Sequence, residues 1–93
     1  MFISSLLKGK VAIVTGGGTG LGLAIAKRMG ELGADIAVGS RQSEHLEHGT
    51  ADLRHAGLDP LAVQVDVRKP EQVDEMVHRV IRHFGRILLA SIV

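Results

Sequence analysis

The chain lacks several residue types, and each absence restricts its chemistry. Its 93 residues include no cysteine, tryptophan or tyrosine, and Phe2 and Phe84 are the only phenylalanines. Without cysteine, disulfide bonds, thiolate catalysis and cysteine-ligated zinc are excluded. The formal net charge is only +1. A chain without a basic run or stacking aromatic residues is not expected to bind nucleic acid.

Long apolar runs are also missing. No segment is apolar for long enough to span a bilayer, and Met1–Lys10 has a short apolar run without the cleavage site of a signal peptide. We therefore expect no membrane partner and a cytoplasmic location. A content of 45% hydrophobic and 23% charged residues is typical of a globular protein. The length allows a single domain, residues 1–93.

Short apolar runs alternate with helical patterns along the chain. The predicted strands are Lys10–Thr15, Asp35–Ser40, Leu61–Val67 and Ile87–Val93. The predicted helices are Leu21–Leu32, Ser43–Ala56 and a third from Pro70 to the residue before Gly85. This alternation predicts an α/β fold, a doubly wound parallel sheet of the Rossmann type with about four strands and three helices. The expected strand order is third, second, first, fourth.

Apolar spacing indicates which helix faces are buried. The first helix has Leu21, Ile25, Met29 and Leu32 at helical spacing. The second has the weakest face, formed by Leu46, Thr50 and Leu53, and Ser43 is its candidate N-cap. The strongest apolar face belongs to the third helix, where Pro70 occupies the first turn.

A glycine-rich loop, Thr15–Gly22, joins the first strand to the first helix. Its spacing is T-G-x-x-x-G-x-G, which fits neither G-x-G-x-x-G nor a Walker A loop. Gly16 permits a tight turn, Gly20 lets the backbone approach a pyrophosphate, and Gly22 lets the helix pack close to the sheet. The helix N-terminus then favours an anion. The alternative is a flexible turn without a ligand.

The strand Lys10–Thr15 and the loop after it resemble the opening of the short-chain dehydrogenases/reductases (SDRs), and the resemblance extends from about Leu7 to Ile87. The loop most resembles that of members that reduce dienoyl- or enoyl-CoA thioesters. The resemblance implies the N-terminal, dinucleotide-binding portion of an oxidoreductase. The predicted cofactor-binding residues are Thr15, Gly16, Gly18, Thr19, Gly20, Leu21, Gly22, Ser40, Arg41, Asp66 and Val67.

The end of the second strand favours NADP over NAD. Arg41 lies about 20 residues after the glycine loop, where NAD-binding folds place a carboxylate for the ribose 2′-OH. No acid occurs between Ile36 and Ser43. A guanidinium can grip a phosphate, and the Ser40 hydroxyl can add a hydrogen bond. The alternative is a solvated arginine at the start of a loop.

The family resemblance implies roles for two residues after the third strand. The Asp66 carboxylate would accept a hydrogen bond from the adenine amino group, and the Val67 N–H would meet the ring. Asp66 could also cap a turn before Pro70. No metal site is predicted, because His45 and His48, although spaced i, i+3, lie on a polar helix face that reads as solvated.

The resemblance breaks after Ile87. SDRs continue with an aspartate and a strand that ends Asn-Asn-Ala-Gly, whereas this chain reads Leu88-Leu89-Ala90-Ser91-Ile92-Val93. The family's catalytic tyrosine has no counterpart, so no catalytic residue is predicted. We interpret the chain as a truncated or frameshifted reading frame, with a natural short protein as the alternative origin.

Three functions remain open at this point. The chain is the NADP(H)-binding portion of an SDR and is inactive alone, or it is a non-catalytic dinucleotide-binding module, or it pairs with another chain through a sheet edge. The run Ile87–Val93 carries neither charge nor proline, so we expect self-association through this edge strand.

Overall fold

A computed structural model describes residues 6–16, 20–85 and 91–92, the last pair by backbone only. Its elements are β1 (Val11–Thr15), α1 (Gly20–Glu31), β2 (Asp35–Ser40), α2 (Ser43–His55), β3 (Leu61–Gln64), α3 (Pro70–Phe84) and β4 (Ser91–Ile92). The alternation of strands and helices agrees with the sequence pattern. Of the predicted strand Ile87–Val93, the part outside Ser91–Ile92 lies outside the described residues.

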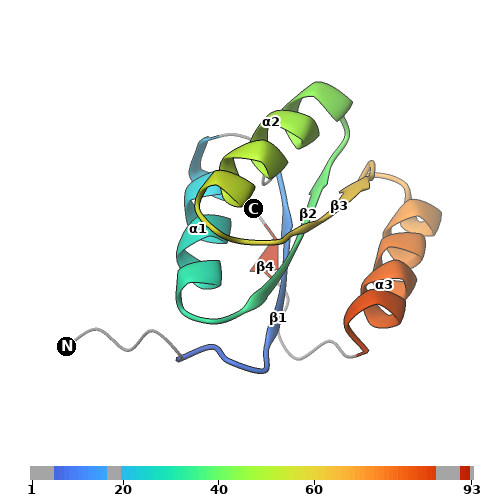
Figure 1. Ribbon diagram of the computed structural model, residues 1–93. Helices are drawn as coiled ribbons and strands as arrows, with labels where there is room; N and C mark the ends of the chain where they lie inside the picture. Colours follow the sequence, from blue (N-terminus) through green and yellow to red (C-terminus); the bar gives the residue numbers. More distant parts are fainter. Residues whose placement is uncertain (1–5, 17–19, 86–90, 93) are drawn as a thin grey trace.

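The strands form a parallel sheet in the order β3-β2-β1-β4. Val11 pairs with Asp35, and Ala37 pairs with Leu61. Figure 1 shows α1 and α2 on one face of the sheet and α3 on the other. The predicted doubly wound parallel sheet is therefore confirmed, and so is the order of its strands.

The core has two layers, because alternate residues of β1 point to opposite faces. Ala12 and Val14 belong to the cluster beneath α1 and α2, whereas Val11 and Ile13 belong to the cluster beneath α3. All of β1 is buried. This is the environment that its continuous apolar run predicts.

The apolar spacing of α1 predicts only part of its packing. Leu21 is 71% exposed, whereas Met29 packs against the core beneath α1 and α2. The buried residues of the helix are Gly22, Ala26 and Gly30. A small residue is needed at Gly30, because a Cβ there would come within 2.6 Å of a methyl carbon of Leu58, in the connection between α2 and β3.

The third strand is shorter than predicted, since β3 ends at Gln64 rather than Val67. The Val65 N–H still donates to the Ser40 carbonyl oxygen at 2.9 Å. Because β2 ends at Ser40, the backbone beyond Val65 has no neighbouring strand to pair with. The chain turns instead, and the Lys69 N–H donates to the Asp66 carbonyl oxygen at 3.0 Å.

The boundaries of the other helices follow local chemistry. Ser43 is the first helical residue of α2 rather than its cap, and Gln42 is the N-cap without a side-chain bond. Pro70 occupies the start of α3, and Gly85 ends it with a φ of 80°. The weak face of α2 is nevertheless buried, with Leu53 fully enclosed.

Candidate functional site

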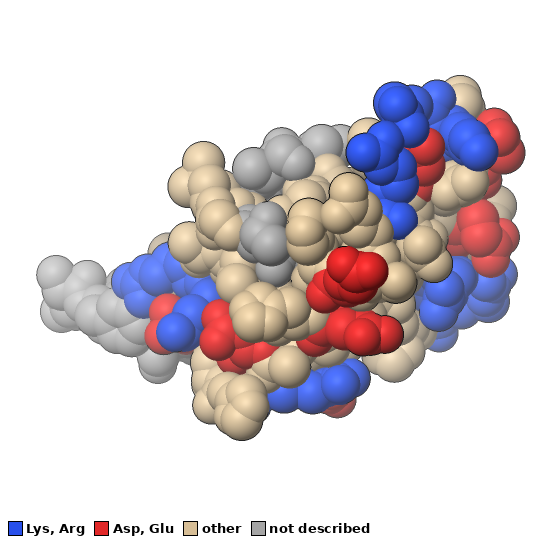
Figure 2. All heavy atoms as spheres, turned by 90° about the horizontal axis from the view of Figure 1, so that it is seen from above, with Lys and Arg blue, Asp and Glu red and all other residues tan. Residues whose placement is uncertain are grey.

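The carboxyl ends of β1, β2 and β3 meet at one edge of the sheet, and the predicted ligand-binding residues gather there. In open α/β sheets this edge is where ligands bind. Figure 2, seen from above, looks onto this edge, and lysine and arginine side chains gather toward its upper right. The distribution of charge is therefore uneven although the net charge is only +1.

The glycine loop leaves β1 through a tight turn. Thr15 is buried at the end of the strand, and Gly16 has a φ of 73°. The Gly16 N–H donates to the Gly39 carbonyl oxygen at 2.8 Å, which ties the loop to β2. The predicted contacts Gly18 and Thr19 lie outside the described residues.

Gly20 begins α1 in the left-handed region, with a φ of 57°. A Cβ at this position would meet no atom of the described residues within 4 Å. Gly22 is buried, and Leu21, between the two glycines, is 71% exposed.

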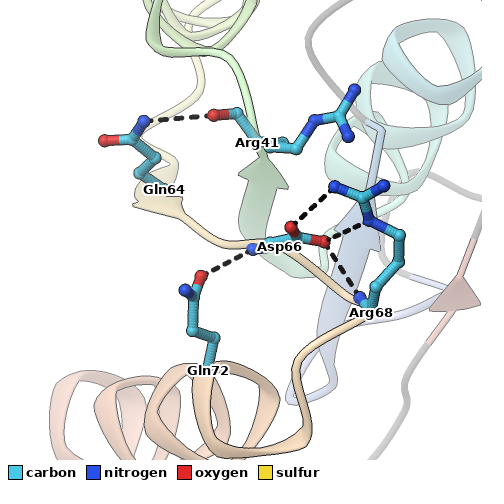
Figure 3. Close-up of polar contacts among 5 residues, drawn as sticks. All are labelled: Arg41, Gln64, Asp66, Arg68 and Gln72. Carbon is cyan, nitrogen blue, oxygen red and sulfur yellow. Dashed lines mark hydrogen bonds and ion pairs between the residues drawn. The ribbon is translucent and has the colours of Figure 1, made fainter.

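Ser40 ends β2 at the same edge of the sheet, and Arg41 follows it. The Ser40 hydroxyl oxygen accepts a hydrogen bond from the Gln42 N–H at 3.3 Å. The Arg41 carbonyl oxygen accepts one from the Gln64 amide at 3.1 Å, as Figure 3 shows. Within residues 6–16 and 20–85, the Arg41 guanidinium has no hydrogen-bond or ion-pair partner.

Asp66 is held by a neighbour that the sequence analysis overlooked. One carboxylate oxygen accepts from the Arg68 backbone N–H and Nε, and the other accepts from its terminal guanidinium nitrogen, each at 3.0 Å. Figure 3 shows this pair beside Arg41. The backbone contact is the turn-capping role left open for Asp66. A carboxylate has about four acceptor positions, so capacity for a further donor remains.

The Asp66 carboxyl group is strongly acidic. Hydrogen bonds from Arg68 lower its pKa from 3.8 to about 2, and the positive charge of Arg41 contributes to the shift. The Asp66 N–H donates to the Gln72 side-chain oxygen at 2.8 Å, which fixes the turn against α3. Val67 is 52% exposed, and its N–H has no partner among the described residues.

The acidity of Asp66 is testable by titration. Its folded pKa lies below the ordinary value, so the contact with Arg68 is fully present above about pH 4 and is lost as the pH falls toward 2. NMR titration of the carboxyl carbon is expected to give a value near 2. The Arg68→Ala variant is expected to return it toward 3.8. A wild-type value near 3.8 would contradict the arrangement.

A polar hollow of about 450 Å³ lies between these groups. It is lined by Arg41, Gln64, Val65, Asp66, Lys69 and Gln72. Gln64, Lys69 and Gln72 were not predicted. The one sequence feature that could have indicated these lining residues is the pair of basic residues between Asp66 and Pro70, Arg68 and Lys69. Glutamines follow no recognisable sequence pattern. A second, apolar hollow of about 400 Å³ lies between β1 and α3.

In the part of the chain that the structure describes, no group of three histidine, aspartate or glutamate residues could hold a metal ion. No helix among those residues is long and apolar enough to cross a membrane.

The fold and the loop first define a class. A parallel sheet with a glycine turn between β1 and α1 is the nucleotide-binding region of a Rossmann-type oxidoreductase. Residues 10–89 match the family model of the short chain dehydrogenases. The chain belongs to this family, and the resemblance seen in its sequence is confirmed.

Known relatives share most of this chain. The peroxisomal 2,4-dienoyl-CoA reductase of Arabidopsis thaliana is 35% identical over 86 residues, which cover 92% of this chain and 29% of that protein. The crystal structure of an NAD⁺-bound xylitol dehydrogenase is 38% identical, with a TM-score of 0.84, and the match covers 90% of this chain and 32% of that one.

A third relative differs in cofactor from the xylitol dehydrogenase. The NADPH-dependent 3-quinuclidinone reductase from Rhodotorula rubra is 33% identical, with a TM-score of 0.81, over 94% of this chain and 33% of that one. Similar proteins therefore use either dinucleotide. The chain spans about a third of the length of the relatives it matches.

Proposed function

We propose that this chain is the NADP(H)-binding portion of a short-chain dehydrogenase/reductase, that residues 1–93 form one domain, and that these residues alone do not catalyse. The observation that carries the proposal is the position of Arg41. Its guanidinium lines a polar hollow at the end of β2 and has no partner among the described residues. No acid lies beside it in the sequence to hold a ribose 2′-OH.

The other predicted contacts fit the same cofactor. Among the described residues nothing lies within 4 Å of a Cβ at Gly20, which supports the approach of a pyrophosphate to the start of α1. The proposed contacts of this phosphate cradle are Thr15, Gly16, Gly18, Thr19, Leu21 and Gly22. Asp66 retains acceptor capacity for the adenine amino group, and the Val67 N–H is unpaired among the described residues. Ser40, which precedes Arg41 in the chain, carries a hydroxyl that can add a hydrogen bond to the phosphate.

Arg41→Ala is expected to erode a preference for NADP over NAD about ten- to a hundredfold, because a hydrogen bond to a charged group contributes about 1.5–3 kcal/mol. Titration of both cofactors against wild type and variant measures the effect. Arg54→Ala is the control, since Arg54 is also exposed but lies in the last turn of α2. Equal affinities of the wild type for the two cofactors would contradict the proposed preference for NADP(H).

Catalysis requires residues that these 93 do not contain. The family's proton-donating tyrosine is absent, since there is no tyrosine. The purified chain is therefore expected to turn over no alcohol, ketone or enoyl-CoA ester with NADP(H). Turnover that follows the chain through purification would contradict this part of the proposal.

We also propose that these 93 residues reside in the cytoplasm.

A separate proposal is that they self-associate through β4. In the described sheet β4 is an outer strand that pairs only with β1: Ser91 pairs with Val14, and Ile92 pairs with Thr15. An edge without charge or proline pairs readily with another edge. Sedimentation at several concentrations, with Ile92→Lys for comparison, is expected to show association that the lysine weakens. A concentration-independent monomer would exclude it, and would also disfavour the alternative of an edge-strand interaction protein.

A further inference from the structure

We propose that Lys69 is a second cation for the 2′-phosphate and acts together with Arg41. This inference rests on the proposed NADP(H) function and deepens it. Lys69 was not among the residues that the sequence indicated. It is the N-cap residue of α3, and its side chain makes no capping bond there.

Lys69 and Arg41 line the same hollow from two different connections. Arg41 follows β2, whereas Lys69 lies between β3 and α3. Hydrogen bonds to backbone oxygens fix the two segments: the Gln64 side-chain amide donates to the Arg41 carbonyl oxygen, and the Lys69 backbone N–H donates to the Asp66 carbonyl oxygen. Among residues 6–16 and 20–85, neither the Lys69 ammonium nor the Arg41 guanidinium has an acidic partner.

The charge balance of the hollow favours a doubly charged anion. Among the described residues, Asp66 is the only acidic one that lines it, and Arg68 binds that carboxylate through paired hydrogen bonds. Neither Arg41 nor Lys69 forms an ion pair with a carboxylate in the described part of the chain. A phosphate monoester carries about −1.5 to −2 at neutral pH, so two cations match it better than one.

Arg68 has an indirect part in this balance. The pair that it forms with Asp66 keeps a negative charge from opposing the phosphate. Removal of the guanidinium leaves the carboxylate without its bound counter-charge at the wall of the hollow that Arg41 and Lys69 also line. Arg68 is thus a positioning residue, and Lys69 is the one expected to contact the ligand.

The test compares two small probes that differ only in the 2′-phosphate, adenosine 2′,5′-bisphosphate and adenosine 5′-monophosphate. Lys69→Gln is expected to weaken binding of the bisphosphate about three- to tenfold, the range of a charge-assisted contact reduced by solvent exposure. Binding of the monophosphate is expected to stay within about twofold, because this probe lacks the group that Lys69 meets. Raising the salt concentration should shrink the difference between wild type and variant.

Two further variants give the comparison its controls. Lys10→Gln makes the same charge change just before β1, at the amino ends of the strands, and is expected to leave both affinities unchanged. Arg68→Gln is expected to weaken binding of the bisphosphate more than binding of the monophosphate. Circular dichroism checks that each variant is folded.

The outcomes separate the two proposals. If Arg41→Ala weakens the bisphosphate but folded Lys69→Gln does not, the role of Lys69 is overturned and the NADP(H) proposal stands. If wild type binds the bisphosphate no better than the monophosphate, the NADP(H) proposal falls, and the role of Lys69 falls with it.

Discussion

Gly20→Val is expected to abolish measurable dinucleotide binding while the helix content of the chain is largely kept. Gly20 is the first residue of α1, and a Cβ on it would extend into space that no described residue occupies within 4 Å. That space is where a pyrophosphate must approach the first N–H groups of the helix. A branched side chain there would hold the anion away from these donors.

Backbone strain makes a matched control necessary. Gly20 has a φ of 57°, and valine at such a position costs about 1–3 kcal/mol. Gly57 has a φ of 86° and equally open surroundings, but it follows α2 on the way to β3, away from the loop. Gly57→Val therefore reproduces the strain without the steric block.

Titration with NADPH, followed by fluorescence, measures the effect in both variants. Thermal unfolding is expected to show similar losses for Gly20→Val and Gly57→Val, whereas only Gly20→Val loses binding. Unchanged affinity in Gly20→Val would mean that the loop does not hold the phosphates. Equal loss of affinity in both would assign the effect to strain.

The sequence predicted the sheet well because its strands are continuous apolar runs. All of β1 is buried, and β2 has the predicted bounds. The error in β3 has a simple physical cause. Val65 and Val67 are as apolar as the strand before them, but β2 ends at Ser40 and leaves Val67 nothing to pair with. Strand length depends on the neighbour, which a local pattern does not contain.

The face of α1 was only partly predicted. Large apolar residues usually indicate the buried side of a helix, and Met29 does pack against the core. The residues that are fully buried, however, are Gly22, Ala26 and Gly30. The role predicted for Gly22 was close packing, and its burial agrees with that role, whereas the apolar pattern alone did not indicate the small residues.

The predicted site residues share a chemistry that residue type reveals. Glycines between a strand and a helix indicate a phosphate cradle, and an arginine after the second strand indicates a phosphate partner. The contact between Arg68 and Asp66 depends on a side-chain conformation across a turn. The spacing of the two residues in the sequence does not predict this contact. Lys69 was not predicted because it precedes Pro70, and the start of α3 is enough to explain the proline. Nothing in the local pattern assigns a role to the lysine.

Leu53→Ala is expected to destabilise the chain more than any substitution at the site. Leu53 is fully buried and belongs to the cluster that joins α2 to β1 and β2. Truncation of a buried leucine costs about 2–5 kcal/mol. A domain of this size has a free energy of unfolding of roughly 5–14 kcal/mol in total, so the variant loses a large share of it.

Leu6→Ala is the matched control, because Leu6 is 59% exposed and the chemical change is the same. Thermal unfolding is expected to lower the Tm by at least about 8 °C for Leu53→Ala and hardly at all for Leu6→Ala. Equal melting temperatures for Leu53→Ala and wild type would show that α2 is not anchored through this residue.

The destabilisation caused by Leu53→Ala should also affect cofactor binding, because α2 begins just after Arg41. The core beneath α2 holds this helix against β2, and the helix in turn fixes the backbone from which the guanidinium extends. Below its melting temperature, Leu53→Ala is therefore expected to weaken NADPH more than NADH, since only the 2′-phosphate relies on Arg41. Equal weakening of both cofactors would mean that the position of Arg41 is set by the Gln64 contact and the end of β2 rather than by α2.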